Sequence, residues 1–142
     1  RPRDWSSDVC SSDLTILAAS TSVPPERVER MEAAGHKVLI TESKRRIVDL
    51  EELFKHLYEL GITSVLVEGG RQIHTSLFKL GLIDKVVVFI APKIFGGKKP
   101  TGPLEDLGIN LVSKGFTLER VEIRQFGTDV CIEGNVIRKN GR

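Results

Sequence analysis

The sequence predicts an α/β fold on the basis of three patterns. Short apolar runs rich in valine and isoleucine alternate with longer segments whose apolar residues recur every three or four positions, as on one face of a helix. Glycines follow these helical segments, where helix C-termini favour them. Two further runs around a late glycine predict an antiparallel hairpin. Together they favour a mostly parallel sheet with helices on both faces and a C-terminal antiparallel hairpin at its edge.

The first half of the chain predicts two strands and two helices. Residues 15–19 form an apolar run that predicts a buried strand. Residues 24–35 predict a helix, because two prolines open the segment and a glycine closes it. Residues 36–41 alternate weakly, as in a second strand. Residues 49–61 begin with a capping-box pattern and end in glycine, which predicts the second helix.

The second half continues the alternation and then changes character. Residues 64–67 predict a third strand, and residues 73–80 predict a helix with one apolar face. Residues 85–91 are almost wholly apolar, which suggests an interior strand covered on both faces. Prolines and glycines make residues 98–115 loop-like. Residues 116–132 predict the hairpin, with a bulge where the alternation shifts phase.

Composition limits the classes of partner. The length of 142 residues suits one domain with a sizeable core, and the net charge of +2 is too small to indicate a nucleic-acid partner. The basic clusters at residues 44–46 and 98–99 are interpreted as solvated loops. Cys10 and Cys131 give no metal-ligand spacing. No apolar run reaches membrane-spanning length, so we expect no membrane partner and a cytoplasmic location.

Residues 1–14 differ from the rest of the chain. The triplet Ser-Ser-Asp occurs at residues 6–8 and again at residues 11–13, without apolar periodicity. Residues 8–14 resemble a translated sequencing-library adapter, so we set residues 1–14 aside as a non-native tail. Residues 15–142 are then expected to be the C-terminal portion of a domain whose first part lies upstream.

The main candidate site is the junction between the third predicted strand and the helix after it. The apolar run ends in Glu68, Gly69 and Gly70, and helical periodicity follows directly. A strand–glycine–helix junction aims free backbone N–H groups and a positive dipole end at an anion. We therefore predict a phosphate-bearing ligand at residues 69–76, with Glu68 facing the same crevice. The alternative is a tight turn with an exposed glutamate.

Side chains just after the glycines allow two interpretations each. Arg71 either pairs with a phosphate or is solvated, and Thr75 and Ser76 either donate to a phosphate or lie on the helix surface. His74 is interpreted as a surface or boundary residue, because the sequence places no partner beside it for a catalytic triad. We predict no catalytic residue and no metal site.

Four stretches carry a resemblance to a known family. They are residues 65–70 (Val-Leu-Val-Glu-Gly-Gly), 82–85 (Leu-Ile-Asp-Lys), 89–97 (Phe-Ile-Ala-Pro-Lys-Ile-Phe-Gly-Gly) and 127–130 (Gly-Thr-Asp-Val). In this order and spacing they resemble the reductase domain of riboflavin biosynthesis, the C-terminal half of the bifunctional RibD-type deaminase/reductase. The resemblance covers about residues 15–137 and implies a dihydrofolate-reductase-like fold.

The resemblance implies an NADPH-dependent oxidoreductase. Family members reduce the ribosyl group of 5-amino-6-(5-phosphoribosylamino)uracil to a ribityl group. Their glutamate before the glycines contacts that substrate, and the matching residue here is Glu68. The cofactor carries the hydride chemistry. The cofactor contacts implied by the match are Ser20, Thr21, Gly69, Gly70, Arg71, Gln72, Ile73, His74, Thr75 and Ser76.

The sequence also departs from the family pattern. Family reductase domains begin with a strand carrying lysine and a Ser-x-Asp-Gly pattern, which the residues before position 15 lack, and no zinc deaminase signature occurs. We therefore expect a domain that is incomplete at its N-terminus, binds NADPH weakly and turns over no substrate. The intact protein is expected to form a homodimer.

Two other functions stay open. A non-catalytic module that binds a nucleotide or phosphometabolite would use the same glycine turn. The related reductase of a diaminopyrimidinone ribosylamine phosphate would share the cofactor segment and differ in the residues that read the base. A purely structural role is a third interpretation.

Overall fold

The computed structural model describes residues 15–43, 46–94 and 102–137. Contacts divide the chain into two compact units, residues 1–65 and 66–142, and each unit is described by itself. The predicted tail at residues 1–14 lies outside the described residues, as do positions 44–45 and 95–101 of two predicted loops. Within the described ranges, no helix is both long and apolar enough to cross a membrane.

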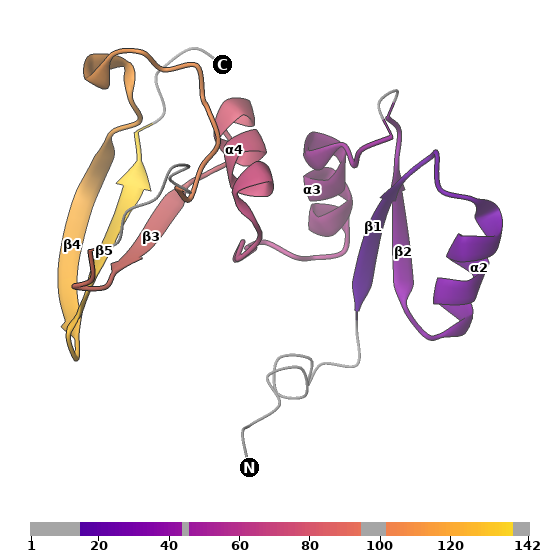
Figure 1. Cartoon of the computed structure of the whole chain (residues 1–142). Helices are drawn as coiled ribbons and strands as arrows, with labels where there is room; N and C mark the ends of the chain where they lie inside the picture. The colour runs from indigo at the N-terminus through magenta and orange to yellow at the C-terminus, as the bar shows by residue number, and fades with distance from the viewer. Residues whose placement is uncertain (1–14, 44–45, 95–101, 138–142) are drawn as a thin grey trace. The chain divides into compact units, whose positions relative to one another are not determined.

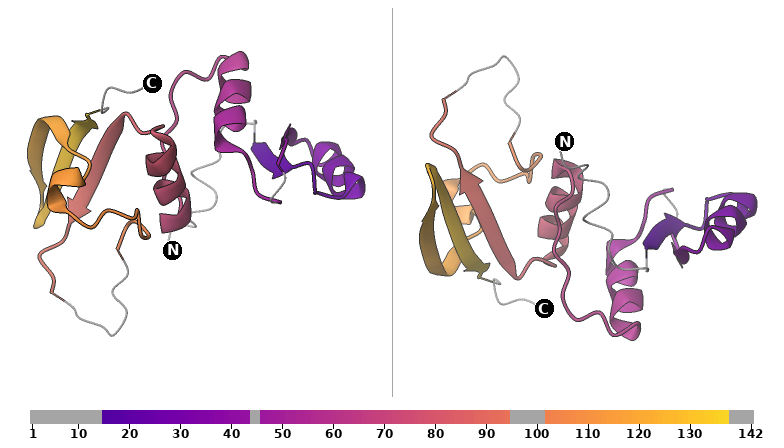
Figure 2. Two further views of the ribbon diagram at one scale, coloured as in Figure 1. Left: turned by 90° about the horizontal axis from the view of Figure 1, so that it is seen from above. Right: turned by 90° about the horizontal axis from the view of Figure 1, so that it is seen from below.

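The first unit contains a parallel pair of strands, β1 (Ile16–Ser20) and β2 (Lys37–Thr41). Helix α2 (Pro25–Ala33) connects them, and helix α3 (Leu50–Glu59) follows β2. Both helices contact β2, and they lie on opposite sides of the strand pair in every view (Figures 1 and 2). The predicted helices on both faces of parallel strands are therefore observed in this unit.

The helix ends follow the predicted sequence signals. Gly35 and Gly61, just beyond α2 and α3, have φ angles of +87° and +81°, which glycine adopts without a Cβ penalty. The Asp49 carboxylate caps α3 by accepting from the Glu52 N–H at 2.9 Å. The Glu52 carboxylate does not complete a capping box, because it accepts from the Glu42 N–H at 2.7 Å.

A buried threonine joins the ends of the two strands to α3. Thr41 is fully buried, and its hydroxyl donates to the Ala19 carbonyl at 3.4 Å. The same oxygen accepts from the Asp49 N–H at 2.9 Å. The carboxyl end of this sheet and the start of α3 are therefore held by one side chain.

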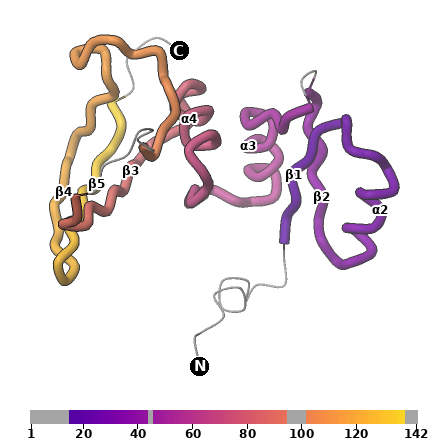
Figure 3. The backbone as a smooth tube through the Cα atoms, in the orientation of Figure 1, coloured from indigo at the N-terminus to yellow at the C-terminus, as the bar shows by residue number. Residues whose placement is uncertain are grey.

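The second unit contains helix α4 (Arg71–Leu80) and an antiparallel sheet. The sheet has the order β3–β5–β4, formed by β3 (Lys85–Ile90), β4 (Leu118–Phe126) and β5 (Asp129–Val136), and a short 3₁₀ turn, η1 (Val112–Lys114), precedes β4. Figure 3 shows β4 and β5 running side by side into their shared turn. The predicted hairpin is confirmed, and so is its bulge, which lies between Glu119 and Glu122.

Two aromatic rings lie close together on one face of this sheet. Phe89 pairs with Cys131 in the register, and the rings of Phe89 and Phe126 lie 5.9 Å apart between centroids. Cys131, on the same face, is buried.

An ion-pair cluster lies on the same face. Glu133 accepts a hydrogen bond from Lys85 Nζ at 2.7 Å, and Arg124 contacts the other oxygen of the carboxylate. The hydrogen bond and charge of Lys85, reinforced by Arg124, lower the pKa of Glu133 below its ordinary value of 4.5. This cluster ties all three strands together.

The opposite face is aliphatic. The register aligns Val88 with Ile132 and Ile132 with Ile123, so branched side chains run across the three strands. Ile123 is 69% exposed and Ile90, on the same face, is 49% exposed. Single exposed apolar residues are common on proteins, but a contiguous row of them is not.

Two strand predictions are wrong, one in the existence of the strand and the other in its place in the sheet. Residues 64–67 form no strand in the described structure, because no described strand offers them backbone partners. The strand predicted at residues 85–91 exists as β3, but it lies at a sheet edge, antiparallel to β5, with Phe89 62% exposed. An apolar run reports side-chain character and does not specify which strand pairs with it. Among the described strands, parallel pairing is confined to β1 and β2.

Candidate functional site

The predicted ligand segment occupies the start of α4. The helix begins after Gly70, which acts as N-cap without any side-chain capping hydrogen bond. The Gly70 carbonyl accepts from Ile73 and His74, whereas the N–H groups of Arg71 and Gln72 point out of the first turn without an intrahelical acceptor. Free N–H groups and a positive dipole end at this position suit a negatively charged group.

A side chain would meet different surroundings at Gly69 and at Gly70, the two glycines before α4. A Cβ on Gly69 would lie 2.5 Å from Cγ2 of Ile73, so any other residue there would force the Ile73 side chain to shift. A Cβ on Gly70 would meet nothing within 4 Å, and its φ of −72° is open to any residue. Packing therefore does not explain Gly70, and the space beside its Cα is open.

Four further predicted residues lie at or near the helix surface. Glu68, Arg71, Gln72 and Ser76 are exposed. Arg71 Nε lies 3.6 Å from a carboxylate oxygen of Glu105, so its guanidinium is shared with the protein's own acid. The Ser76 hydroxyl donates to the Gln72 carbonyl at 2.9 Å, within the helix. Both interpretations of Arg71 and Ser76 are compatible with this geometry.

Thr75 is held inside the protein. Its side chain is 4% exposed, and its hydroxyl donates to the Arg71 carbonyl at 2.7 Å. The same oxygen accepts from the Glu105 N–H at 2.7 Å. A hydroxyl with one proton is thus fully used, and this arrangement fits an anchor of the 102–106 segment better than a phosphate donor.

His74 is half-buried and contacts main chain on two sides. Its Nε2 lies 3.3 Å from the Val67 carbonyl oxygen, and its Nδ1 lies 3.4 Å from the Pro103 carbonyl oxygen. The interpretation of His74 as a boundary residue agrees with this placement. Ile73 is 37% exposed and contacts the turn at Gly69. The apolar face of α4 is centred on Leu77, which is buried.

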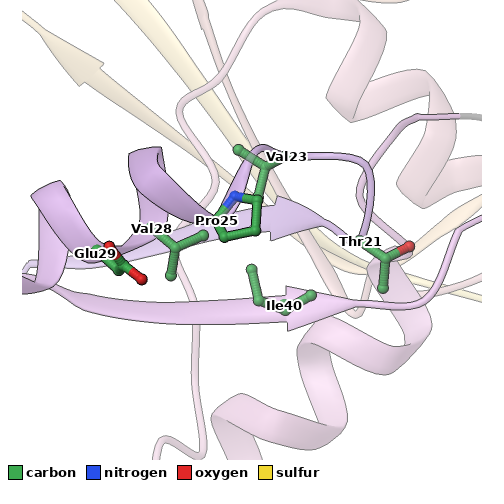
Figure 4. A pocket seen from close by; sticks show the side chains of 6 residues that line it. All are labelled: Thr21, Val23, Pro25, Val28, Glu29 and Ile40. Carbon is green, nitrogen blue, oxygen red and sulfur yellow. The ribbon is translucent and has the colours of Figure 1, made fainter.

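Ser20 and Thr21 belong to the first unit, at the carboxyl end of β1. Ser20 is buried, and its hydroxyl lies 2.7 Å from that of Ser22. Thr21 is exposed and borders a shallow cavity of about 370 Å³ between α2 and β2 (Figure 4). The cavity is otherwise lined by Val23, Pro25, Val28, Glu29 and Ile40. Of the two predicted contacts, Thr21 is thus the accessible one.

Sequence reasoning missed the segment around Pro103–Glu105. It was predicted only as loop, yet it contacts Arg71, His74 and Thr75. About thirty residues separate these partners, and no periodic signal in a single sequence reports such a distant contact. Within the part of the chain that the structure describes, no cluster of metal-ligating side chains is found.

The fold is similar to solved pyrimidine reductase structures. A pyrimidine reductase-like protein from Corynebacterium diphtheriae matches with a TM-score of 0.65 and 18% identity, over 89% of this chain and 50% of that protein. RibD from Acinetobacter baumannii matches with a TM-score of 0.61 and 16% identity, over 86% of this chain and 37% of that protein. At these identities the likeness concerns the fold, and the predicted α/β class is confirmed.

Sequence relatives include two kinds of protein. The chain is 28% identical over 127 residues to riboflavin biosynthesis protein RibD from Actinobacillus pleuropneumoniae, covering 89% of this chain and 34% of that protein. It is 33% identical over 122 residues to 2,5-diamino-6-ribosylamino-4(3H)-pyrimidinone 5′-phosphate reductase from Methanothermobacter thermautotrophicus, covering 86% of this chain and 55% of that protein. The chain thus spans between about a third and about half of their length.

The RibD C-terminal domain family matches residues 2–132, which is most of the chain. The match includes part of residues 1–14, and our boundary at residue 14 stays a prediction. The four stretches that carried the resemblance indicated the correct family: this chain belongs to the RibD C-terminal domain family.

Proposed function

We propose that this chain supplies part of the NADPH site of a reductase acting on a pyrimidine ribosylamine 5′-phosphate. Its relatives are named as a riboflavin biosynthesis protein and as a pyrimidinone phosphate reductase. When bound, NADPH supplies the hydride that converts the ribosyl group of 5-amino-6-(5-phosphoribosylamino)uracil into the ribitylamino product. The chain's own contribution is binding and orientation.

The observation that carries this proposal is the open start of α4. Gly70 leaves space where any other residue would place a Cβ, and no side chain caps the first turn. The exposed N–H groups of Arg71 and Gln72 would hold a dinucleotide phosphate, and the Arg71 guanidinium would add a positive charge.

Glu68 has a separate role in this proposal. It is exposed and directly precedes the glycines, so its carboxylate is available beside the phosphate position. We assign it to the substrate, where it would accept hydrogen bonds from hydroxyl or amino groups. Thr21, beside the cavity of the first unit, is the second proposed cofactor contact.

We further propose that the chain alone is an incomplete reductase. It spans between about a third and about half of its relatives' length, so residues outside it are available to complete the site. The intact protein is expected to be a cytoplasmic homodimer. Sedimentation of the intact protein tests the dimer, and a monomer at micromolar concentration would contradict it.

The test is a titration of the chain with NADPH, followed residue by residue through its backbone amide NMR signals. We expect weak, saturable changes at residues 69–72, because these N–H groups face the phosphate. Gly70→Val should abolish them by filling the open space, whereas Lys79→Arg, an exposed and charge-conserving change in the last turn of the same helix, should leave them intact. Unchanged signals at residues 69–72 at saturating NADPH would contradict the proposal.

The diaminopyrimidinone reductase is the second candidate, favoured by the 33% identity to the enzyme of that name. It would share the NADPH segment and differ in the base that is accepted. Assay of the intact protein with both ribosylamine phosphates separates the two. A protein that binds NADPH and reduces neither would support the non-catalytic module instead.

A further inference from the structure

One imidazole links two main-chain segments that lie far apart in the sequence. His74 is half-buried, with Nε2 3.3 Å from the Val67 carbonyl oxygen and Nδ1 3.4 Å from the Pro103 carbonyl oxygen. Val67 directly precedes Glu68, the proposed substrate contact. Pro103 begins the segment that lies against the first two turns of α4.

From this geometry we infer that His74 is a positioning residue, which fixes the main chain at Glu68 by tying it to the 103–105 segment. The inference deepens the proposed function and rests on it for the role of Glu68. It also reassigns His74, which was predicted from the family match as a cofactor contact.

The chemistry of the ring supports this role. Both neighbours are carbonyl oxygens, which accept hydrogen bonds and do not donate them. A neutral imidazole carries one N–H and donates to one of the two oxygens, whereas an imidazolium donates to both. The charged ring therefore bonds both segments, whereas the neutral ring bonds one of them and lies against the carbonyl of the other.

Two neighbours of His74 hold the same segment. The Thr75 hydroxyl accepts from the Glu105 N–H at 2.7 Å and is nearly fully buried. Arg71 Nε lies 3.6 Å from the Glu105 carboxylate. Arg71, His74 and Thr75 thus all contact the 103–105 segment, which holds it against the start of α4. Of these three residues, His74 also contacts the Val67 carbonyl.

Fixing the Val67 carbonyl restricts the peptide plane that leads into Glu68. Glu68 is itself exposed, so its own surroundings do little to orient it. The position of its carboxylate relative to the start of α4 therefore depends on the Val67 contact. Loss of that contact should disturb Glu68 without removing any group that touches the ligand.

The experiment compares three variants of the full chain by NMR. His74→Ala should speed hydrogen exchange of the Glu105 amide by about two- to tenfold, the range expected for loss of one hydrogen bond. It should also shift the carboxyl carbon signal of Glu68. His74→Gln keeps an N–H donor, so both changes should be smaller in this variant than in His74→Ala. Ser76→Ala removes a hydroxyl that bonds within α4, and it should change neither the Glu105 exchange nor the Glu68 signal.

A measurement on the unaltered chain protects the test against a variant that fails to fold. At least one ring N–H of His74 should exchange with water more slowly than those of His36, whose ring makes no hydrogen bond or ion pair within the described residues. Equal exchange at the two histidines, or a His74→Ala chain with unchanged Glu105 and Glu68 signals, would overturn the inference. If these signals respond but NADPH leaves residues 69–72 unaffected, the proposed function fails and the positioning contact stands.

Discussion

At the scale of single residues, the two glycines before α4 differ in their surroundings. A Cβ at Gly69 would overlap the Ile73 side chain, whereas Gly70 faces open space and has an ordinary φ angle. The sequence presents them as equivalent neighbours, so only the geometry separates the structural glycine from the one available to a ligand.

The two glycines should respond oppositely to substitution. Gly70→Ser should raise the free energy of unfolding by a few tenths of a kcal/mol, because serine caps a helix better than glycine, yet it should weaken NADPH binding. Gly69→Ala should lower the free energy of unfolding by about 1–3 kcal/mol, because its Cβ would overlap Ile73. Urea denaturation and NADPH titration of both variants check this. Equal losses of stability would contradict the distinction.

Glu133 should make stability depend on pH. Lys85 and Arg124 lower its pKa in the folded chain, so the unfolded chain binds protons more readily as the pH falls. The stabilisation is present above the ordinary pKa of 4.5 and is lost as the pH falls through the lower folded value. The urea midpoint should therefore fall as the pH is lowered through and below 4.5, and less so in Glu133→Gln. An identical pH dependence in that variant would exclude this role.

At the scale of elements, helices were predicted better than strand partners. The three helices begin and end close to their predicted positions, because caps and glycines are local signals. The pairing of β3 with β5 and the lack of a strand at residues 64–67 depend on partners far along the chain. The same holds for the contact of α4 with the 103–105 segment.

The cap of α3 gives a test at this scale. Asp49→Ala should lower the free energy of unfolding by about 0.5–2 kcal/mol, because the Glu52 N–H loses its acceptor. Lys55→Ala, an exposed change within the same helix, is the matched control and should stay within about 0.5 kcal/mol. Thermal or urea denaturation measures both. A cap variant no less stable than the control would mean that water replaces the carboxylate at no cost.

At the scale of the whole molecule, the exposed aliphatic face of the β3–β5–β4 sheet is a surface open to association. Its branched side chains form a row across the three strands, and Ile123 is the most exposed of those described above. Apolar rows of this kind favour self-association.

Ile123→Lys should therefore reduce concentration-dependent association of the chain. The charge interrupts the apolar row at its most exposed position, on β4 at the sheet edge. Arg120→Lys, a change in the same strand that conserves charge, is the control. Sedimentation velocity over a range of concentrations measures the effect, and equal association of the two variants would assign it to another surface.

The sequence by itself determined the α/β class, the three helices with the glycines that end them, the hairpin with its bulge, and the family, because each depends on local periodicity or on residues in a fixed order. Only the tertiary structure decided that Thr75 and His74 hold the 103–105 segment, that Gly70 is open, and that β3 pairs antiparallel at an edge. The physical reason is the separation along the sequence over which each interaction acts. Backbone propensity and capping act within a few residues, whereas a hydrogen bond between positions about thirty apart exists only once the chain has folded.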